Sequence, residues 1–488
     1  MAEPPGAAAT NSAAALPVLP LAPPIEPMFT RAPGLNWAGP GDRWTRAWAV
    51  DAPRDPGPSA LPAAPARPEL PGGSAFPALP ALAALPALPG SPALPQPVAA
   101  APAGQAVEQL PTARDIELIR SCLAVVEPVA DRATAHFYAL LFLHHPEIRA
   151  LFPAAMDVQR DRLFRSLLMA ARNADHPAGL TEYLTGLGRG HRKYGTLTGH
   201  YGAVGECLVA ALARYCGSRW DADAELAWRR AYGLVAKVMI DAAEQAAKTS
   251  PPWWQAEVVA HRLGTPDVAV LTVRPDQAYP YRAGQYTTLE TPWWPRVWRH
   301  FSFATAPRSD GLLTFHVKAV QAGWVSNALV HRAAPGDVLR LGPAAGGMVL
   351  DRADGADLLC VGGGTGIAPI TALVEEVAAY GSRGRSVDVF YGARQHTGLY
   401  GLDALRRLAQ GNPWLTVHPV LPPEAGGVDG AECGELPEAV VRRGPWTGRA
   451  AFVSGPPTMV RRTAAALLRC GVPQASVHHD LEGEPTVR

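Results

Sequence analysis

The chain has 488 residues, 48% of them hydrophobic, and a formal net charge of +1 at pH 7. This length is too great for a single core and predicts about three domains. The balanced charge gives no reason to expect nucleic acid or an anionic membrane as a partner. The six cysteines include no Cys-x-x-Cys pair, which argues against a disulfide framework and a cysteine zinc site and favours a reducing compartment.

Residues 1–111 are rich in alanine and contain 25 of the 50 prolines. Such a composition cannot bury enough apolar surface to offset chain entropy, so we expect a disordered, partly polyproline tail. Within it, Trp37, Trp44 and Trp48 offer a contact to a partner or to the body of the protein. The chain shows no secretory signal pattern and no run of about 18 apolar residues that would predict a membrane span. We therefore expect a soluble, cytoplasmic protein.

Residues 112–250 predict an all-helical domain. Thr112 followed by Asp115 is typical of a helix start, and helical periodicity with little proline continues from there. Within this domain His191 shares a helix face with Leu184 and Leu187, because spacings of three and four residues lie on one side of a helix. A histidine on such a face is either a ligand or a buried core residue, and the spacing alone does not decide between them.

Two further domains follow in the sequence pattern. Residues 251–350 switch to a period of two in "AEVVAHRL", "VAVLTVRP", "LLTFHVKAV" and "DVLRLG", which predicts an antiparallel β-barrel or sandwich. Residues 351–488 alternate apolar strands, such as "DLLCV" and "SVDVFYG", with helical stretches such as "APITALVEEVAAYG". That alternation predicts a parallel sheet flanked by helices.

A glycine-rich turn gives the most specific chemical signal. The buried strand "DLLCV" runs directly into Gly362, Gly363, Gly364, Thr365 and Gly366, and a helix follows. Glycines let the backbone approach a pyrophosphate, and the start of the helix offers free N–H groups and a positive dipole end. The dinucleotide fingerprint itself is not matched, because an isoleucine occupies its last small position. The alternative is a glycine turn that serves only packing.

The motifs of residues 251–488 resemble the ferredoxin-reductase superfamily. "GGGTGIAP", "FYGAR" and "VSGPPTM" are similar to its nicotinamide domain, and "AGQY", "RHFSF" and "GWVSNAL" are similar to its flavin domain. Physically, Arg299 can pair with the flavin diphosphate and Ser302 can hydrogen-bond near the ring nitrogen that receives hydride. The resemblance implies FAD contacts from Tyr286, Arg299, His300, Phe301, Ser302 and Ser326, and nucleotide contacts from Gly362, Gly363, Gly364, Thr365, Gly366, Arg394, Ser454, Gly455 and Pro456.

Three features of this part depart from the family or stay open. Phe301 replaces the usual tyrosine of the flavin motif, which removes a hydroxyl contact. Beyond Phe452 no Phe, Tyr or Trp remains to cover the flavin, and only His478 and His479 stand near that place. The choice between NADH and NADPH is open, although Arg394 at a strand end could meet a 2′-phosphate.

The helical domain resembles the globin domain of the flavohaemoglobins, a family that joins a haem globin to such a reductase. The resemblance covers about residues 115–484 and rests on "HFYALLFLHHPEIRALF", "QRDRLFRSLL", "RGHRKYG", "HYGAVGECL" and "AWRRAYGLVAKVMI". It implies that His191 is the proximal ligand of the iron of haem b, through a neutral ring nitrogen. Carried over by motif, Tyr138, Gln159 and Leu163 lie on the distal side, Phe152 wedges the haem, and Tyr201 reaches the proximal histidine.

One match to the globin motif fails. Family members carry a glutamate that hydrogen-bonds the proximal histidine, and its place falls on Ala243, with Glu244 beside it. A one-residue shift turns a side chain by about 100° on a helix, so Glu244 reaches the pocket only if the helix register slips. Without that carboxylate the imidazole would donate less electron density to iron.

The resemblance implies a nitric oxide dioxygenase. Electrons would pass from NADPH or NADH through FAD to haem, and NO and O2 would become nitrate, with Tyr138 and Gln159 donating hydrogen bonds in the distal pocket. A different class is a globin that senses or stores oxygen or NO while its own reductase keeps the iron ferrous. A third is a haem-free reductase whose helical domain shields the flavin. We expect a monomer, with the tail as its contact for partners.

Overall fold

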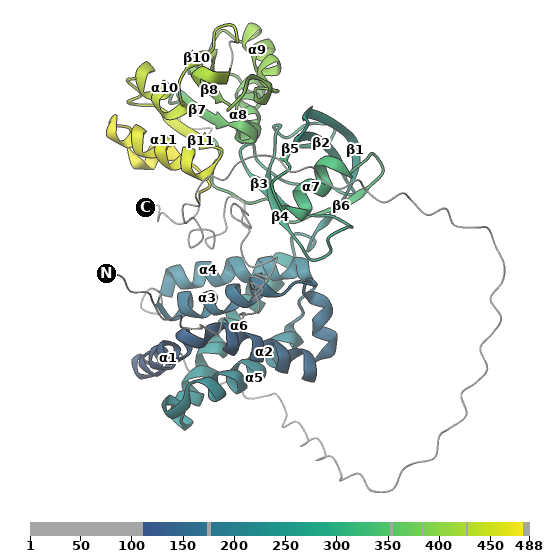
Figure 1. Cartoon of the computed structure of the whole chain (residues 1–488), viewed down its shortest axis with the longest axis vertical. Coiled ribbons are helices and arrows are strands. Elements are labelled where there is room, and N and C mark those ends of the chain that lie inside the picture. The colour runs from purple at the N-terminus through teal and green to yellow at the C-terminus, as the bar shows by residue number, and fades with distance from the viewer. Residues whose placement is uncertain (1–110, 173–176, 352–354, 383, 426–427, 482–488) are drawn as a thin grey trace, which may run out of the picture.

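The computed structural model describes residues 111–481 except 173–176, 352–354, 383 and 426–427. The predicted tail, apart from its last residue, lies outside these residues, as do Trp37, Trp44 and Trp48. Within the described part, helices come first, an antiparallel sheet second and a parallel sheet third (Figure 1). The predicted fold class and the predicted order of the three folded units are confirmed.

The first unit is helical, and its first helix begins where the sequence predicts. Thr112 caps α1: its hydroxyl accepts the Asp115 N–H at 3.2 Å, and the Asp115 carboxylate accepts the Thr112 N–H at 2.8 Å. Asp115 also pairs with Arg230 at 3.4 Å and so joins the first helix to the last. The elements are α1 (Ala113–Val126), η2 (Glu127–Val129), α2 (Ala130–His144), η3 (Pro146–Leu151), α3 (Asp157–Arg172), α4 (Pro177–His191), η4 (Arg192–Tyr194), α5 (Thr198–Tyr215), η5 (Gly217–Arg219) and α6 (Ala222–Ala247).

The close approach of α4 to α6 depends on a glycine. A Cβ at Gly188 would lie 2.2 Å from the Met239 carbonyl oxygen of α6, so no other residue fits without moving a helix. Gly188 lies one turn before His191, the last residue of α4. The packing that brings the two helices together therefore also fixes the position of the candidate ligand. Elsewhere in this unit the core is built from apolar residues such as Phe137, Leu141 and Leu212.

The cysteines include one pair that the sequence does not predict. Cys122 of α1 and Cys216 at the end of α5 form a disulfide, with their Cα atoms 5.3 Å apart. The expectation of no disulfide framework is wrong for this pair. Residue spacing could not reveal it, because the two cysteines are 94 residues apart and only the packing of α1 against the end of α5 brings them together.

The second unit is a barrel of strands in the order β4-β3-β6-β1-β2-β5, and every strand pair is antiparallel. A bridge between Phe303 and Phe315 joins the two edges and closes it. Closure leaves no sheet edge for unwanted pairing. Leu271, Phe315 and Leu339 are among the fully buried residues of its core. The elements are β1 (Trp254–Thr265), β2 (Val268–Pro275), β3 (Tyr286–Glu290), β4 (Arg299–Ser302), β5 (Leu313–Lys318), α7 (Trp324–His331) and β6 (Val338–Leu341).

The third unit is a parallel sheet in the order β10-β9-β8-β7-β11-β12. Helices cover both faces: Leu373 of α8 and Leu405 of α9 belong to one buried cluster, and Val440 of α10 and Leu467 of α11 belong to the other. The elements are β7 (Leu358–Gly363), η6 (Gly364–Gly366), α8 (Ile367–Tyr380), β8 (Val387–Gly392), η7 (His396–Gly398), α9 (Leu402–Gln410), β9 (Leu415–Leu421), η8 (Pro423–Ala425), β10 (Glu432–Cys433), α10 (Leu436–Arg443), β11 (Ala450–Ser454), α11 (Pro457–Arg469), η9 (Gln474–Ser476) and β12 (Val477–His478).

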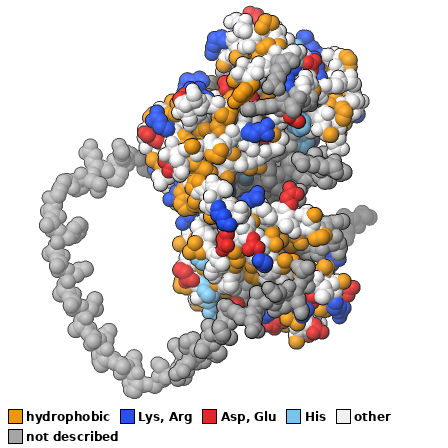
Figure 2. All heavy atoms as spheres, turned by 180° about the vertical axis from the view of Figure 1, so that it is seen from behind, with side chains coloured by type: hydrophobic (Ala, Val, Ile, Leu, Met, Phe, Trp, Pro, Cys, Tyr) orange, Lys and Arg blue, Asp and Glu red, His pale blue; other side chains and the backbone are white. Residues whose placement is uncertain are grey.

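The helical unit lies below the barrel in Figure 1, and the parallel sheet with its helices lies beside the barrel. On the face seen in Figure 2, basic and acidic side chains alternate, and no area of a single sign dominates. None of the described helices combines the length and the hydropathy that a membrane crossing requires.

Candidate functional site

His191 has the hydrogen bond that a metal-binding histidine needs. Its Nδ1 lies 2.7 Å from the Leu187 carbonyl oxygen. A carbonyl oxygen only accepts, so Nδ1 carries a proton and donates it, and Nε2 is left as the unprotonated nitrogen. Burial lowers the pKa of His191; Lys193 lowers it further, while the bond to Leu187 opposes both. A neutral imidazole with its tautomer fixed by a backbone carbonyl is the form that ligates iron.

The residues predicted for the distal side lie together. The Tyr138 hydroxyl donates to the Gln159 backbone carbonyl at 3.2 Å, and the Tyr138 and Phe152 rings meet edge to face with centroids 5.6 Å apart. Leu163, one turn beyond Gln159 on α3, packs against the same apolar cluster. Burial raises the pKa of Tyr138 far above its usual value, although Arg160 and Arg162 oppose this. Tyr138 therefore stays protonated and can act as a donor throughout the physiological range.

Tyr201 is placed where its hydroxyl lacks a partner. Its oxygen is buried, and no described residue hydrogen-bonds it. Its backbone carbonyl accepts a 2.6 Å hydrogen bond from the Tyr232 hydroxyl of α6, which holds the start of α5 in place. A buried hydroxyl without a partner costs about 1 to 3 kcal/mol, so this site favours a polar group that the described residues do not supply.

Glu244 does not join this set. The helix α6 runs without interruption over Ala222–Ala247, so its register does not slip. The carboxylate of Glu244 is exposed and accepts a hydrogen bond from the Thr198 hydroxyl at 3.3 Å. The atom next to the His191 ring is instead the Leu187 carbonyl. Among the described residues, no three His, Cys, Asp or Glu side chains gather as a metal site.

Apart from Ser326, the predicted flavin residues of the barrel lie on the adjacent strands β3 and β4. In the β3–β4 pairing Tyr286 faces Ser302, and the rings of Tyr286 and His300 meet edge to face at 5.3 Å. Strand alternation places Arg299 and Phe301 on the opposite face of β4 from His300 and Ser302. Phe301 packs against the barrel core, and the Arg299 guanidinium donates to the Trp298 carbonyl at 2.7 Å.

His300 is held neutral. Burial lowers its pKa to about 3, and the charges of Lys193, Arg162 and Arg299 add to the effect. Lys193 and Arg162 belong to the helical unit, whereas Arg299 belongs to the barrel. The junction of the two units is therefore a place of concentrated positive charge, which suits anionic groups of a cofactor.

Ser326 lies in the first turn of α7, which packs closely against the residues before it. The Ser326 hydroxyl accepts the Val320 N–H at 3.3 Å and donates to the Gly323 carbonyl at 3.1 Å. The side-chain amide of Asn327 donates to the backbone carbonyls of Val320 and Gly323. A Cβ at Gly323 would lie 2.5 Å from the Ser326 oxygen, which explains the glycine at this position. Ser326 thus holds the start of α7 in shape.

The glycine turn after β7 serves two purposes. Cβ atoms at Gly363 and Gly366 would collide with the segment 454–459, so these glycines let β7 and η6 pack against the start of α11. Gly364 differs: its φ is +56° and a Cβ there would meet nothing within 4 Å. Packing therefore explains part of the turn, and Gly364 is the position open to a ligand's close approach.

The nucleotide motifs meet at one edge of the sheet. Gly364 follows β7, Arg394 follows β8, and the segment 454–456 ends β11, and these three parallel strands are neighbours. The chain order reverses between β7 and β11, which makes this edge a switch point, where ligands bind in open α/β sheets. Arg394 is exposed, and Thr365 lies partly open beside the turn.

Asp480 is a residue that the sequence interpretation missed. Its carboxylate accepts the Gly347 N–H at 3.2 Å, and burial raises its pKa to about 6. A Cβ at Gly346, whose φ is +104°, would lie 2.9 Å from the Tyr286 ring and 3.2 Å from Asp480. Asp480 thus stands beside the predicted flavin residues. Its place directly after the double histidine is the available signal, but the sequence interpretation looks for an aromatic ring there.

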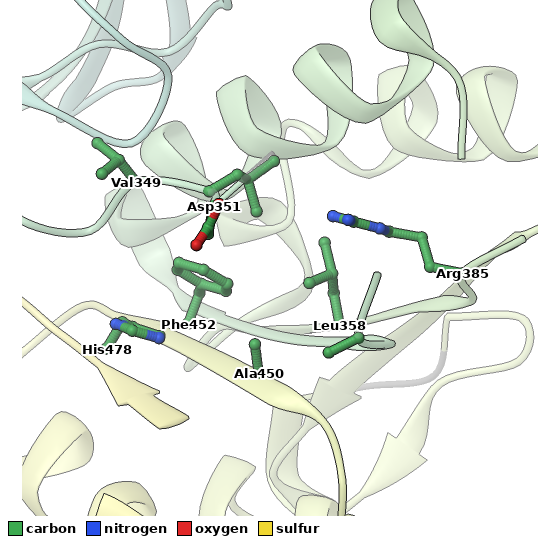
Figure 3. A pocket seen from close by; sticks show the side chains of 9 residues that line it. Val349, Asp351, Leu358, Arg385, Ala450, Phe452 and His478 are labelled. Atoms are coloured by element: carbon green, nitrogen blue, oxygen red, sulfur yellow. The ribbon is translucent and has the colours of Figure 1, made fainter. Parts of the chain in front are cut away.

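His478 lies elsewhere. Its ring stacks on Phe452 at 4.8 Å and lines a cavity of about 60 Å³ between the sheet and the segment 349–351 (Figure 3). Figure 3 shows Asp351 and Arg385 lining the same cavity. Its volume holds a few water molecules and no nucleotide. Another cavity, of about 330 Å³, lies on the barrel around Tyr279, Tyr281 and Arg308 and includes none of the predicted cofactor residues.

The chain matches three family models. Residues 135–239 match the globin family, residues 255–348 match an oxidoreductase FAD-binding domain, and residues 360–465 match an oxidoreductase NAD-binding domain. These matches agree with the three folded units and with their order along the chain.

Several known proteins resemble most of the chain. The flavohemoprotein of Chromobacterium violaceum is 28% identical over 394 residues, which cover 75% of this chain and 96% of that protein. The flavohemoprotein of Pseudomonas aeruginosa is 30% identical over 275 residues, 53% of this chain and 69% of that protein. A crystal structure of flavohemoglobin from Malassezia yamatoensis with bound FAD and heme has a TM-score of 0.62 at 20% identity, covers 76% of this chain and 99% of its own, and supports the fold.

Proposed function

This chain belongs to the flavohaemoprotein family, and on that premise we propose that it is a nitric oxide dioxygenase that converts NO and O2 to nitrate with electrons from NAD(P)H. It is an NAD(P)H-dependent oxidoreductase that joins a globin to FAD- and NAD-binding domains. The observation that carries the finer proposal is the pair of polar groups in the helical unit, a neutral His191 with Nε2 unprotonated and a buried Tyr138 hydroxyl.

Both cofactors of the family fit the residues present. In the helical unit, His191 supplies one neutral nitrogen and the buried Tyr201 hydroxyl has no partner among the described residues. In the barrel, the rings of Tyr286 and His300 lie together on the β3–β4 pair, and positive charge gathers at the junction. When bound, haem supplies the oxygen-binding iron and FAD accepts hydride and gives electrons singly.

The chain's own residues prepare the helical pocket for a ligand that gains negative charge. Tyr138 keeps its proton because burial raises its pKa, so its hydroxyl remains a donor. Its present acceptor, the Gln159 carbonyl, is 3.2 Å away, a long distance for a hydroxyl donor. The hydroxyl can therefore turn to a better acceptor at little cost, and a fixed donor in a dry pocket is worth most where charge develops.

In the reductase, the residues hold the nucleotide and orient it. Gly364 offers its open backbone in the turn η6 just before α8, and Arg394 offers a cation at the adjacent strand end. Tyr286 and His300 form one side of the predicted flavin site, with Asp480 close by. These residues set binding and orientation, and the nucleotide supplies the hydride.

The test is Tyr138→Phe. We expect NO consumption to fall by about 10- to 1000-fold, the usual cost of losing one such donor, while reduction of the flavin by NAD(P)H keeps its rate. The matched control is Tyr215→Phe, which removes a hydroxyl from α5 of the same unit. Equal NO consumption in the Tyr138 variant and the parent would refute the role of Tyr138.

The same assay separates the competing function. A sensor or store would bind oxygen or NO without steady formation of nitrate, whereas a dioxygenase forms nitrate for as long as NAD(P)H lasts. O2, NO and NAD(P)H are the small-molecule partners in this proposal. We further propose a cytoplasmic monomer. Light scattering of the purified protein tests the monomer, and fractionation of cells tests the location.

A further inference from the structure

The turn directly after His191 contacts the barrel through Lys193 and Tyr194, and it contacts the segment that leads into the barrel through Arg192. Arg192 donates to the Ser250 carbonyl at 2.6 Å, at the start of the segment that leads into the barrel. Lys193 donates to the Thr288 hydroxyl of β3 at 3.3 Å. The Tyr194 carbonyl accepts a 3.4 Å hydrogen bond from Arg296 of the barrel. The position of η4, and hence the end of α4, is therefore tied to the reductase.

The Arg296 side chain also reaches a second part of the helical unit. Its Nε donates to the Ala150 carbonyl at 3.1 Å. Ala150 lies in η3, two residues before Phe152, the residue predicted to wedge the haem. The Arg296 guanidinium, which belongs to the loop 291–298 of the barrel, thus contacts both η4, directly after His191, and η3, directly before Phe152.

The backbone of Arg296 is held in an uncommon conformation. Its φ is +66°, in the left-handed region that costs a non-glycine residue about 1 to 2 kcal/mol. The buried carboxylate of Glu290 accepts the Arg296 N–H, and Arg340 pairs with the same carboxylate at 3.1 Å. Strain that is held by a buried partner indicates a position selected for a purpose other than stability.

Aromatic rings continue the same junction. The Tyr194 ring lies edge to face with His191 on one side and with Trp298 on the other, each at 6.5 Å between centroids. The Lys193 ammonium lies over both the Tyr194 and the Trp298 rings. Trp298 is buried and directly precedes Arg299 of the predicted flavin motif. The rings of His191, Tyr194 and Trp298 therefore form a continuous series of contacts from the candidate iron ligand to the predicted flavin strand β4.

We propose that η4 and the loop 291–298 form an interdomain latch centred on Arg296. The latch holds the predicted flavin strand β4 against both sides of the pocket around His191. In this way it sets the rate at which electrons pass from flavin to haem. This inference rests on the proposed function in one respect: the protein must bind both haem and FAD. In the step concerned, the flavin loses one electron and the iron gains it. No bond of the latch changes, so Arg296 is a positioning residue.

Position decides this step because the two cofactors belong to different units. Interfaces between domains of one chain are commonly small and polar, and relative motion is expected unless something restrains it. The hydrogen bonds of Arg296 and Lys193 hold the barrel against η3 and η4 of the helical unit. Their loss should leave each cofactor site intact while the separation and orientation of the two vary.

The test uses the holoprotein with haem and FAD and the variant Arg296→Gly. Glycine accepts a φ of +66° without strain, so this change removes the guanidinium and spares the loop. After anaerobic mixing with NADPH, flavin bleaching and the shift of the haem band are followed separately. We expect haem reduction to slow by about tenfold or more and flavin reduction to keep its rate. Arg296→Lys should fall between, and Arg274→Gly, at an exposed arginine of the barrel, should match the parent.

A second readout does not depend on cofactor chemistry. Lys248 is exposed beside Ser250, so trypsin cleavage after Lys248 reports how firmly the junction is held. We expect about tenfold faster cleavage in Arg296→Gly than in the parent. Unchanged haem reduction, or equal slowing of flavin and haem reduction, would overturn the latch. No NO is present in either measurement, so a failure of the dioxygenase proposal would leave this result standing.

Discussion

The helical unit and the reductase present their proposed cofactor sites in different ways. In the reductase, backbone defines the site: Gly364 and Gly346 adopt positive φ values, and the ends of adjacent parallel strands meet at one edge. In the helical unit, single side chains define it, namely His191 on α4 and Tyr138 on α2. A site made of backbone leaves glycines at fixed places in the sequence, whereas a site made of side chains leaves isolated residues that other roles could equally explain.

The largest expected effect is on haem. His191→Ala removes the imidazole whose tautomer the Leu187 carbonyl fixes, so haem content should fall by more than about tenfold, while FAD content and electron transfer from NADPH to ferricyanide persist. Absorbance at the haem and flavin bands measures both. The control His144→Ala removes an exposed histidine of the same unit and should keep its haem. Parent-like haem content in His191→Ala would break the distinction drawn between the two units.

The next effect concerns the backbone-defined site. Gly364→Val places a side chain in the left-handed region and in the open space before α8, so we expect the KM for NADPH to rise about tenfold or more, with haem and FAD retained. Gly381→Val is a matched control, because Gly381 also has a positive φ and open space but lies at the far end of α8. Equal KM values in the two variants would show that backbone strain, and not nucleotide approach, matters.

A third effect concerns the stability of the helical unit, which should depend on reductant, whereas the stability of the reductase should not. Cys122→Ser should lower the free energy of unfolding of the helical unit by about 2 to 4 kcal/mol, because the disulfide restrains 94 residues of the unfolded chain. Calorimetry with and without reductant checks this. The reductase transition should not move, and Cys207→Ser, at a free buried cysteine of the same unit, should keep its response to reductant. Insensitivity of the parent to reductant would contradict the pairing.

The smallest effect is a pH dependence in the reductase. The pKa of Asp480 is about 6 when folded, against 3.8 as its ordinary value. The folded state therefore holds the proton more tightly, and this stabilisation is lost as pH rises from about 4 through 6. Asp480→Asn should be more stable than the parent by about 1 to 2 kcal/mol above pH 6.5, after allowance for partial exposure, and equal to it below pH 4. A pH-independent difference in melting temperature would argue against a buried, protonated Asp480.

Much of the fold could be predicted because the helices and strands leave a local periodicity of apolar residues in the sequence. Thr112 with Asp115 marked the first helix, and the change of period after "TSPPWW" marked the passage to strands. The strand-to-helix turn at 362–366 marked the nucleotide edge. Each of these signals lies within a few residues of the chain, which is the range over which sequence patterns are informative.

What the sequence could not give depends on contacts between distant residues. The pairing of Cys122 with Cys216 required the packing of α1 against α5. The bond from Arg296 to Ala150 joins residues 146 positions apart, and no pattern near Arg296 announces it. Glu244 was weighed as a substitute for the family glutamate, but the unbroken α6 directs it to Thr198 at the surface. Its proposed role near His191 therefore has no contact to support it.

The most direct test of the central claim is a set of visible spectra of the purified protein before and after anaerobic addition of NADPH. We expect an initial spectrum with both a haem and a flavin band. The nucleotide should then bleach the flavin band, after which the haem band should shift to the position of ferrous haem. A flavin band that bleaches while no haem band is present, or while the haem band stays unchanged, would contradict electron flow from the reductase to a haem held by His191.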